Sequence, residues 1–285
     1  MGGPEGLGRP RGSIAAGRGF AWLLQSLVLL RAQAGRLLLI AVVMQLVLGL
    51  VQVPLLGILV VLSVPALTAG ILEAFRVTAG GGAPSLRLLF VPLATAQRRG
   101  RLLALGALVF AIGILCVSLL LGNTLANVDE ATLLRLQQGE MEALTELDPM
   151  FMARLLGAFA FSVAISGTVT FYSIPLVWFG DRRVWPAVGA GLAALLRHWK
   201  PMLVLGAALA AASLPLALAV GALLQVAAAG GVAGYVATGF VMLLLLAFQM
   251  LLFGTQYVSY REIFGAGEPP AAPEAPSGDD GQLVA

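Results

Sequence analysis

Charged side chains are scarce in this sequence. Asp, Glu, Lys and Arg make up only 11% of the 285 residues, 59% are hydrophobic, and the mean hydropathy is +0.95. A globular domain usually carries about 25% charged residues, so this composition excludes an ordinary water-soluble fold. Several uncharged stretches exceed the roughly 18 residues that indicate a transmembrane helix. We therefore expect an all-α, multi-pass membrane protein.

Cysteine, histidine and lysine each occur once, as Cys116, His198 and Lys200. One cysteine excludes an intramolecular disulfide and a CxxC motif, and one histidine excludes a multi-histidine metal site. The arginines form no basic face with interleaved aromatics, so nucleic-acid binding is not expected. No phosphate-binding loop, GxSxG or HExxH motif is present. We expect no catalytic residues, no metal and no cofactor.

The few charges delimit the membrane spans, because a charge is costly at the bilayer centre. Between the charged residues lie uncharged stretches of 36, 27, 26 and 60 residues. At about 1.5 Å per residue, the first and last are too long for one helix across roughly 30 Å of hydrocarbon. Turn signals divide them at Gln52-Val53-Pro54 and at Gly230-Gly231. The predicted spans are 37–53, 54–74, 102–123, 155–179, 202–228 and 232–258.

The arginines also predict the orientation. With the N-terminus inside, 15 of the 17 basic residues fall on the cytoplasmic side, and only Arg135 and Arg154 fall outside. This agrees with the positive-inside rule and places both termini in the cytoplasm. Residues 9–34 also imitate a cleaved signal peptide, but cleavage would invert every loop. We therefore interpret 20–34 as an interfacial helix with Trp22 at headgroup depth. The arginine-rich, lysine-poor composition is typical of a GC-rich bacterial genome, which indicates a bacterial inner membrane.

A similar pattern occurs three times along the chain. An apolar stretch, one or more arginines and a Gly or Pro precede each predicted pair of spans, at 29–36, 86–101 and 185–201. We predict three hairpins, each with a cytoplasmic interfacial helix, in one membrane domain of residues 17–264. The alternative is that arginine beside aromatic anchors is common in any cytoplasmic loop.

Three segments lie outside the packed spans. Residues 1–16 and 265–285 are rich in Gly, Pro and polar residues, and we expect both to be disordered. The external insertion 124–153 carries six acidic residues and leucines at helical spacing, which predicts short helices on the outer face. It lacks the ligand pattern of a calcium loop, so a solvated charged face is favoured over a cation site.

Few polar residues within or beside the spans are candidates for chemistry. Glu73 is placed to pair with Arg76, one helical turn away. His198, between Arg197 and Trp199, is expected to contact headgroups rather than to act in catalysis. The fourth span is the most polar, and its hydroxyl groups predict bonds to their own backbone, with a polar pathway as the alternative. These hydroxyls belong to Ser162, Ser166, Thr168, Thr170, Tyr172 and Ser173.

Several motifs in the second half resemble a known family. They are Pro175-Leu-Val-Trp-Phe-Gly-Asp181, Trp185-Pro-Ala, Leu196-Arg-His-Trp-Lys-Pro201 and Tyr257-Val-Ser-Tyr-Arg-Glu-Ile-Phe264. They look like an uncharacterised family of bacterial six-helix inner-membrane proteins, itself similar to the membrane domain of some glycerophosphodiester phosphodiesterases. By organisation the resemblance spans about 20–264, and the long external insertion departs from it. It implies no catalytic residues, because the soluble hydrolase domain is absent from this chain.

Together these patterns predict a non-enzymatic scaffold or lipid-interacting accessory protein. Its interfacial arginines would contact anionic lipid headgroups. The candidate residues are Arg31, Arg98, Arg99 and Arg197. The alternative is a transporter or channel for a small neutral or lipid-like solute, with the fourth span and several glutamines lining a path at the membrane midplane.

Overall fold

The structure is a computed structural model that describes residues 14–53, 56–126, 134–135 and 150–265. All regular secondary structure in these residues is helical. The predicted disorder of 1–16 and 265–285 falls almost wholly outside the described residues. Most of the predicted insertion 124–153, with its expected short helices, also lies outside them.

Apart from the segment between α5 and α7, the described helices follow one another with short connections. The first half holds α1 (Arg18–Ala32), α2 (Ala34–Gly49) with a 3₁₀ turn at Leu50–Gln52, α3 (Leu56–Ala79), α4 (Arg87–Ala94) and α5 (Ala96–Ala126). The second half holds α7 (Phe151–Trp178), α8 (Val184–Arg197), α9 (Trp199–Ala228) and α10 (Gly231–Phe264).

Six of these helices, namely α2, α3, α5, α7, α9 and α10, are long and apolar enough to cross a membrane. The prediction of six apolar helices is confirmed, with differences at their ends. Helix α5 begins at Ala96 rather than at Leu102, and α10 continues to Phe264. Charged residues near these ends therefore lie on helical turns and not in loops, because a helix need not stop where its apolar stretch stops.

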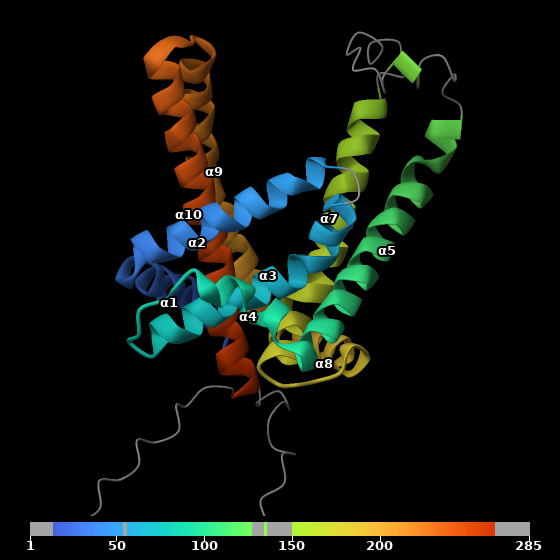
Figure 1. The fold of residues 1–285 in the computed structure, drawn as a ribbon, viewed down its shortest axis with the longest axis vertical. Helices are drawn as coiled ribbons and strands as arrows, with labels where there is room; N and C mark the ends of the chain where they lie inside the picture. Colours follow the sequence, from blue (N-terminus) through green and yellow to red (C-terminus); the bar gives the residue numbers. More distant parts are fainter. Residues whose placement is uncertain (1–13, 54–55, 127–133, 136–149, 266–285) are drawn as a thin grey trace, which may run out of the picture. The chain divides into compact units, whose positions relative to one another are not determined.

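The described chain is divided into two compact units. The first unit holds the residues up to Leu37, Ala74–Pro84 and the residues from His198 on, and the second holds Leu38–Glu73 and Ser85–Arg197. In the first unit α9 and α10 lie side by side, and α1 packs against both (Figure 1). In the second unit α5 and α7 lie side by side, and α8 packs against α7 (Figure 1).

Glycines in the second unit allow its helices to approach closely. A Cβ atom at Gly70 of α3 would lie 2.4 Å from the carbonyl oxygen of Leu89 in α4. A Cβ atom at Gly106 of α5 would lie 2.1 Å from the carbonyl oxygen of Leu62 in α3. Small residues permit this backbone contact, which is a usual way for apolar helices to pack where lipid removes the hydrophobic drive. Both positions exclude any side chain.

Two of the short helices, α4 and α8, pack on the long helix that precedes each in the chain, and α4 also packs on α5. Leu89 of α4 lies against Gly70 of α3, and Gly191 of α8 lies against Ser173 of α7. The first short helix, α1, packs on the last long helix, where Gly254 of α10 meets the Ser26 hydroxyl. The sequence pattern groups each short helix with the hairpin that follows it, and the contact of α4 with α5 agrees with that grouping.

Candidate functional site

The turn after α7 gathers charged side chains in the second unit. Arg98 and Arg101 lie three residues apart on α5 and therefore share a face of that helix. The Nε atom of Arg98 lies 3.3 Å from Oδ1 of Asp181, and Nη1 of Arg101 lies 2.9 Å from the same oxygen. Arg101 also donates to the backbone carbonyl of Asp181 at 2.7 Å. We call Arg98, Arg101, Asp181, Trp178 and Glu73 the Asp181 cluster.

Trp178 links the two parts of the Asp181 cluster. Arg98 donates from Nη1 to the Trp178 carbonyl at 2.8 Å, and its guanidinium lies 5.3 Å from the centroid of the indole ring. The indole Nε1 donates to Oε2 of the buried Glu73 at 3.1 Å. A cation at the end of α7 satisfies a carbonyl that the helix leaves unpaired and also interacts favourably with the helix dipole. The cluster therefore ties α3 and α5 to the end of α7.

This geometry divides the predicted headgroup arginines. Arg98 makes contacts within the protein, whereas the neighbouring Arg99 is exposed. Successive residues on a helix point about 100° apart, so the two side chains leave α5 in different directions. Sequence reasoning missed the interaction of Arg98 with Asp181 because the two residues lie 83 positions apart. It also missed Trp178 as a partner of Glu73.

Arg31 and Arg197 occupy equivalent places on two short helices. Each lies in the last turn of its helix, α1 or α8, and each is exposed. The helix dipole favours a cation at that end, which explains the position without a ligand. The structure puts Arg31 in the first unit and Arg98, Arg99 and Arg197 in the second. Three of the four predicted arginines, all except Arg98, are therefore exposed at or near a helix end.

The first unit contains a second polar cluster, formed by Arg18, Trp22 and Glu262. Arg18 holds the Glu262 carboxylate with two bonds, from Nε at 2.8 Å and from Nη2 at 2.6 Å. The indole of Trp22 donates to Oε2 at 2.9 Å. The hydrogen bond and the charge of Glu262 raise the pKa of Arg18 above its already high ordinary value. Arg18 therefore stays charged as the pH rises, and the pair with Glu262 keeps its cation.

The Glu262 cluster fixes how α1 lies along α10. Arg18 and Trp22 meet Glu262 near the C-terminal end of α10, and the Ser26 hydroxyl donates to the Leu251 carbonyl at 2.8 Å. The residue numbers of these contacts increase along α1 and decrease along α10, so the two helices run antiparallel. Trp22 is completely buried. Its ring therefore packs within the protein and not against lipid, and its depth in the membrane stays a prediction.

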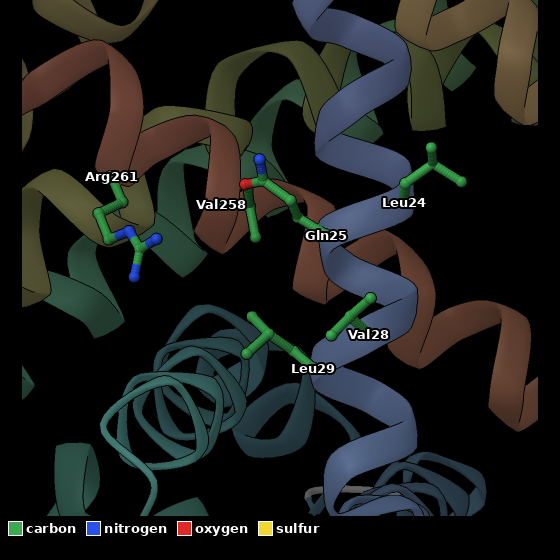
Figure 2. A pocket seen from close by; sticks show the side chains of 6 residues that line it. All are labelled: Leu24, Gln25, Val28, Leu29, Val258 and Arg261. Atoms are coloured by element: carbon green, nitrogen blue, oxygen red, sulfur yellow. The ribbon is translucent and has the colours of Figure 1, made fainter.

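Beside this cluster a groove opens between α1 and α10. Its volume is about 370 Å³, and it is lined by Leu24, Gln25, Val28 and Leu29 of α1 with Val258 and Arg261 of α10 (Figure 2). Leu24 and Val28 are 48% and 67% exposed. The Arg261 guanidinium lies 6.0 Å from the centroid of the Tyr257 ring, one turn before it on the same helix. The groove therefore combines apolar walls with one amide and one cation.

The remaining candidates from the sequence are explained by packing. His198 is only 2% exposed, so the expected contact of its ring with headgroups is wrong. On α7, the hydroxyls of Thr168 and Thr170 donate to the backbone carbonyls of Ala164 and Ser166. These bonds satisfy both hydroxyls within their own helix, as the sequence analysis favoured. They give the alternative of a polar pathway no support.

Within the part of the chain that the structure describes, no three His, Cys, Asp or Glu side chains are grouped so that they could hold a metal ion. Comparison with protein-family models, with curated proteins and with solved structures gives no match for this chain. The fold thus defines a helical protein with six helices long and apolar enough to cross a membrane. Its function has to be argued from its own residues.

Proposed function

We propose that this chain is a non-enzymatic protein of the bacterial inner membrane that binds anionic phospholipid headgroups on its cytoplasmic side, as a scaffold or accessory. The six apolar helices would cross the bilayer as three hairpins, with α1, α4 and α8 near the cytoplasmic surface and both termini in the cytoplasm. The resemblance to a six-helix inner-membrane family agrees with this proposal but assigns no activity.

The exposure of Arg31, Arg99 and Arg197 carries the proposal. All three lie at or near the ends of helices that the positive-inside rule assigns to the cytoplasmic face. Anionic lipids attract such residues by about 1 kcal/mol for each arginine near the surface. Arg98, the fourth candidate, is engaged with Asp181 and Trp178. We therefore assign Arg98 a role in holding α5 to α7.

The test is lipid co-purification. We expect the triple variant Arg31→Gln, Arg99→Gln, Arg197→Gln to retain a smaller fraction of anionic phospholipid than the wild type after extraction in mild detergent. Quantitative mass spectrometry of the lipid classes would measure it. The control is Arg135→Gln with Arg154→Gln, because these arginines flank an acidic segment. The proposal fails if the triple variant and the wild type carry the same lipid mixture.

A further inference from the structure

The groove between α1 and α10 has the chemical character of a site for an amphipathic anion. Four of its six lining residues are aliphatic, and the other two are Gln25 and Arg261. Figure 2 shows the Gln25 amide projecting from α1 toward α10, and Arg261 on the α10 side of the opening. Pockets that bind small molecules usually combine apolar walls with a few polar groups, at about 300–1,000 Å³. At about 370 Å³ the groove is at the lower end of that range.

The positive charge of Arg261 is not offset by a salt bridge to any described residue. The next residue on α10, Glu262, accepts hydrogen bonds from Arg18 and Trp22 of α1. The guanidinium of Arg261 lies over the Tyr257 ring, 6.0 Å from its centroid. Arginine matches phosphate oxygens with two parallel bonds, so this cation suits a phosphate group.

The sequence position of the groove indicates a lipid rather than a soluble anion. Residues 201–260 carry no charge, and Arg261 is the first charge that follows. The groove therefore lies where the apolar part of α10 ends, with Val258 on one side of that boundary and Arg261 on the other. A phospholipid has the same boundary between its acyl chains and its phosphate. The exposed faces of Leu24 and Val28 would continue the apolar surface beyond the groove.

We propose that this groove binds one anionic phospholipid, with its phosphate on Arg261 and Gln25 and an acyl chain along Leu24 and Val28. The assignment rests on the proposed function, since it requires this end of α10 to lie at the membrane surface. It goes further in naming one defined site with its own residues. A site of this kind binds its first lipid more tightly than the lipids that merely surround the protein.

Native mass spectrometry of the full-length, delipidated protein tests the site. We expect the first phosphatidylglycerol to bind more tightly than later ones and more tightly than phosphatidylcholine. Arg261→Gln removes a charge-assisted bond and should weaken the first binding step about tenfold. Val28→Trp fills the groove and should weaken it similarly while leaving Arg261 in place. Arg183→Gln, at an exposed arginine of the second unit, is the matched control and should bind as the wild type does.

Three results would overturn the site. The first is wild-type binding by both Arg261→Gln and Val28→Trp. The second is equal affinity for phosphatidylglycerol and phosphatidylcholine. The third is one-for-one displacement of phosphatidylglycerol by inorganic phosphate, which would indicate a free-phosphate site. The triple variant Arg31→Gln, Arg99→Gln, Arg197→Gln should keep the tight first lipid and lose only the general enrichment. Loss of enrichment in that variant with no effect of Arg261→Gln would refute the groove and leave the proposed function standing. The reverse pattern would refute the three-arginine surface and leave the groove.

Discussion

Asp181 shows how a single residue can serve both the backbone and the electrostatics of a turn. It is the only described residue other than glycine with a positive φ, at 50°. Asp tolerates this left-handed conformation better than most residues because its short side chain bonds locally. The same residue accepts from Arg98 and Arg101. The turn therefore places the carboxylate where both arginines on one face of α5 reach it.

Substitution of Asp181 separates these two effects. Asp181→Gly and Asp181→Ala both remove the carboxylate, but only Ala retains a Cβ atom that is strained at this φ. We expect the Ala variant to be less stable than the Gly variant by about 1 kcal/mol. Unfolding in mixed micelles would measure the difference. At the next residue, Arg182, φ is negative, so there the Ala variant should be more stable than the Gly variant. If Ala proves as stable as Gly at position 181, backbone strain does not operate there.

At the scale of elements, α1 is joined to the end of the chain. Its contacts with α9 and α10 include the close approach of Gly19, where a Cβ atom would lie 2.1 Å from the Pro201 carbonyl oxygen. The buried indole of Trp22 and the paired Arg18 meet Glu262 on α10. The Arg18 pair is partly exposed, with 43% of the arginine side chain accessible, and exposed pairs contribute little. Burial of Trp22 should therefore dominate this contact.

Trp22 and Phe20 form a matched pair on α1, because Trp22 is completely buried and Phe20 is 51% exposed. We expect Trp22→Ala to destabilise the docking of α1 by up to about 3–5 kcal/mol, the usual cost of removing a buried aromatic. Phe20→Ala should change it little. Limited trypsin cleavage at the arginines of α1 would report the loosening. Equal cleavage of the two variants would show that α1 does not depend on its buried face.

Trp22→Phe separates volume from hydrogen bonding in the same experiment. Phe fills most of the space but leaves the Glu262 oxygen without its indole donor. Trp22→Phe should therefore destabilise the docking of α1 by about 1–3 kcal/mol, less than Trp22→Ala does.

For the whole molecule, orientation in the membrane is the property on which the functional proposal depends. Positive-inside counting predicts that the connection between α3 and α4 is cytoplasmic and that the turn between α9 and α10 is external. Ala83 and Ala229 lie in these connections, and both are exposed. The single cysteine of the sequence, Cys116, is buried, so its replacement by serine provides a clean background.

In that background, Ala229→Cys should react with a membrane-impermeant maleimide on intact cells or spheroplasts. Ala83→Cys should react only after lysis. The opposite labelling pattern would support a cleaved signal peptide and an inverted topology, and the cytoplasmic headgroup assignment would then fall.

The sequence by itself determined the helical class and the six apolar helices, because hydrophobicity and the cost of buried charge act locally along the chain. It placed the helix ends less well, because α5 and α10 extend beyond their apolar stretches and include Arg98 and Arg261. It also predicted that Thr168 and Thr170 bond within their own helix, which needs no distant partner.

Only the tertiary structure decided which residues are partners. Asp181 pairs with Arg98, one of the four predicted headgroup arginines, and Glu262 accepts from the buried indole of Trp22. Both pairs join residues far apart in the chain, and a pattern read along one chain carries no information about which faces meet. The groove at Arg261 arises for the same reason, because α1 and α10 lie at opposite ends of the sequence and meet only in the fold.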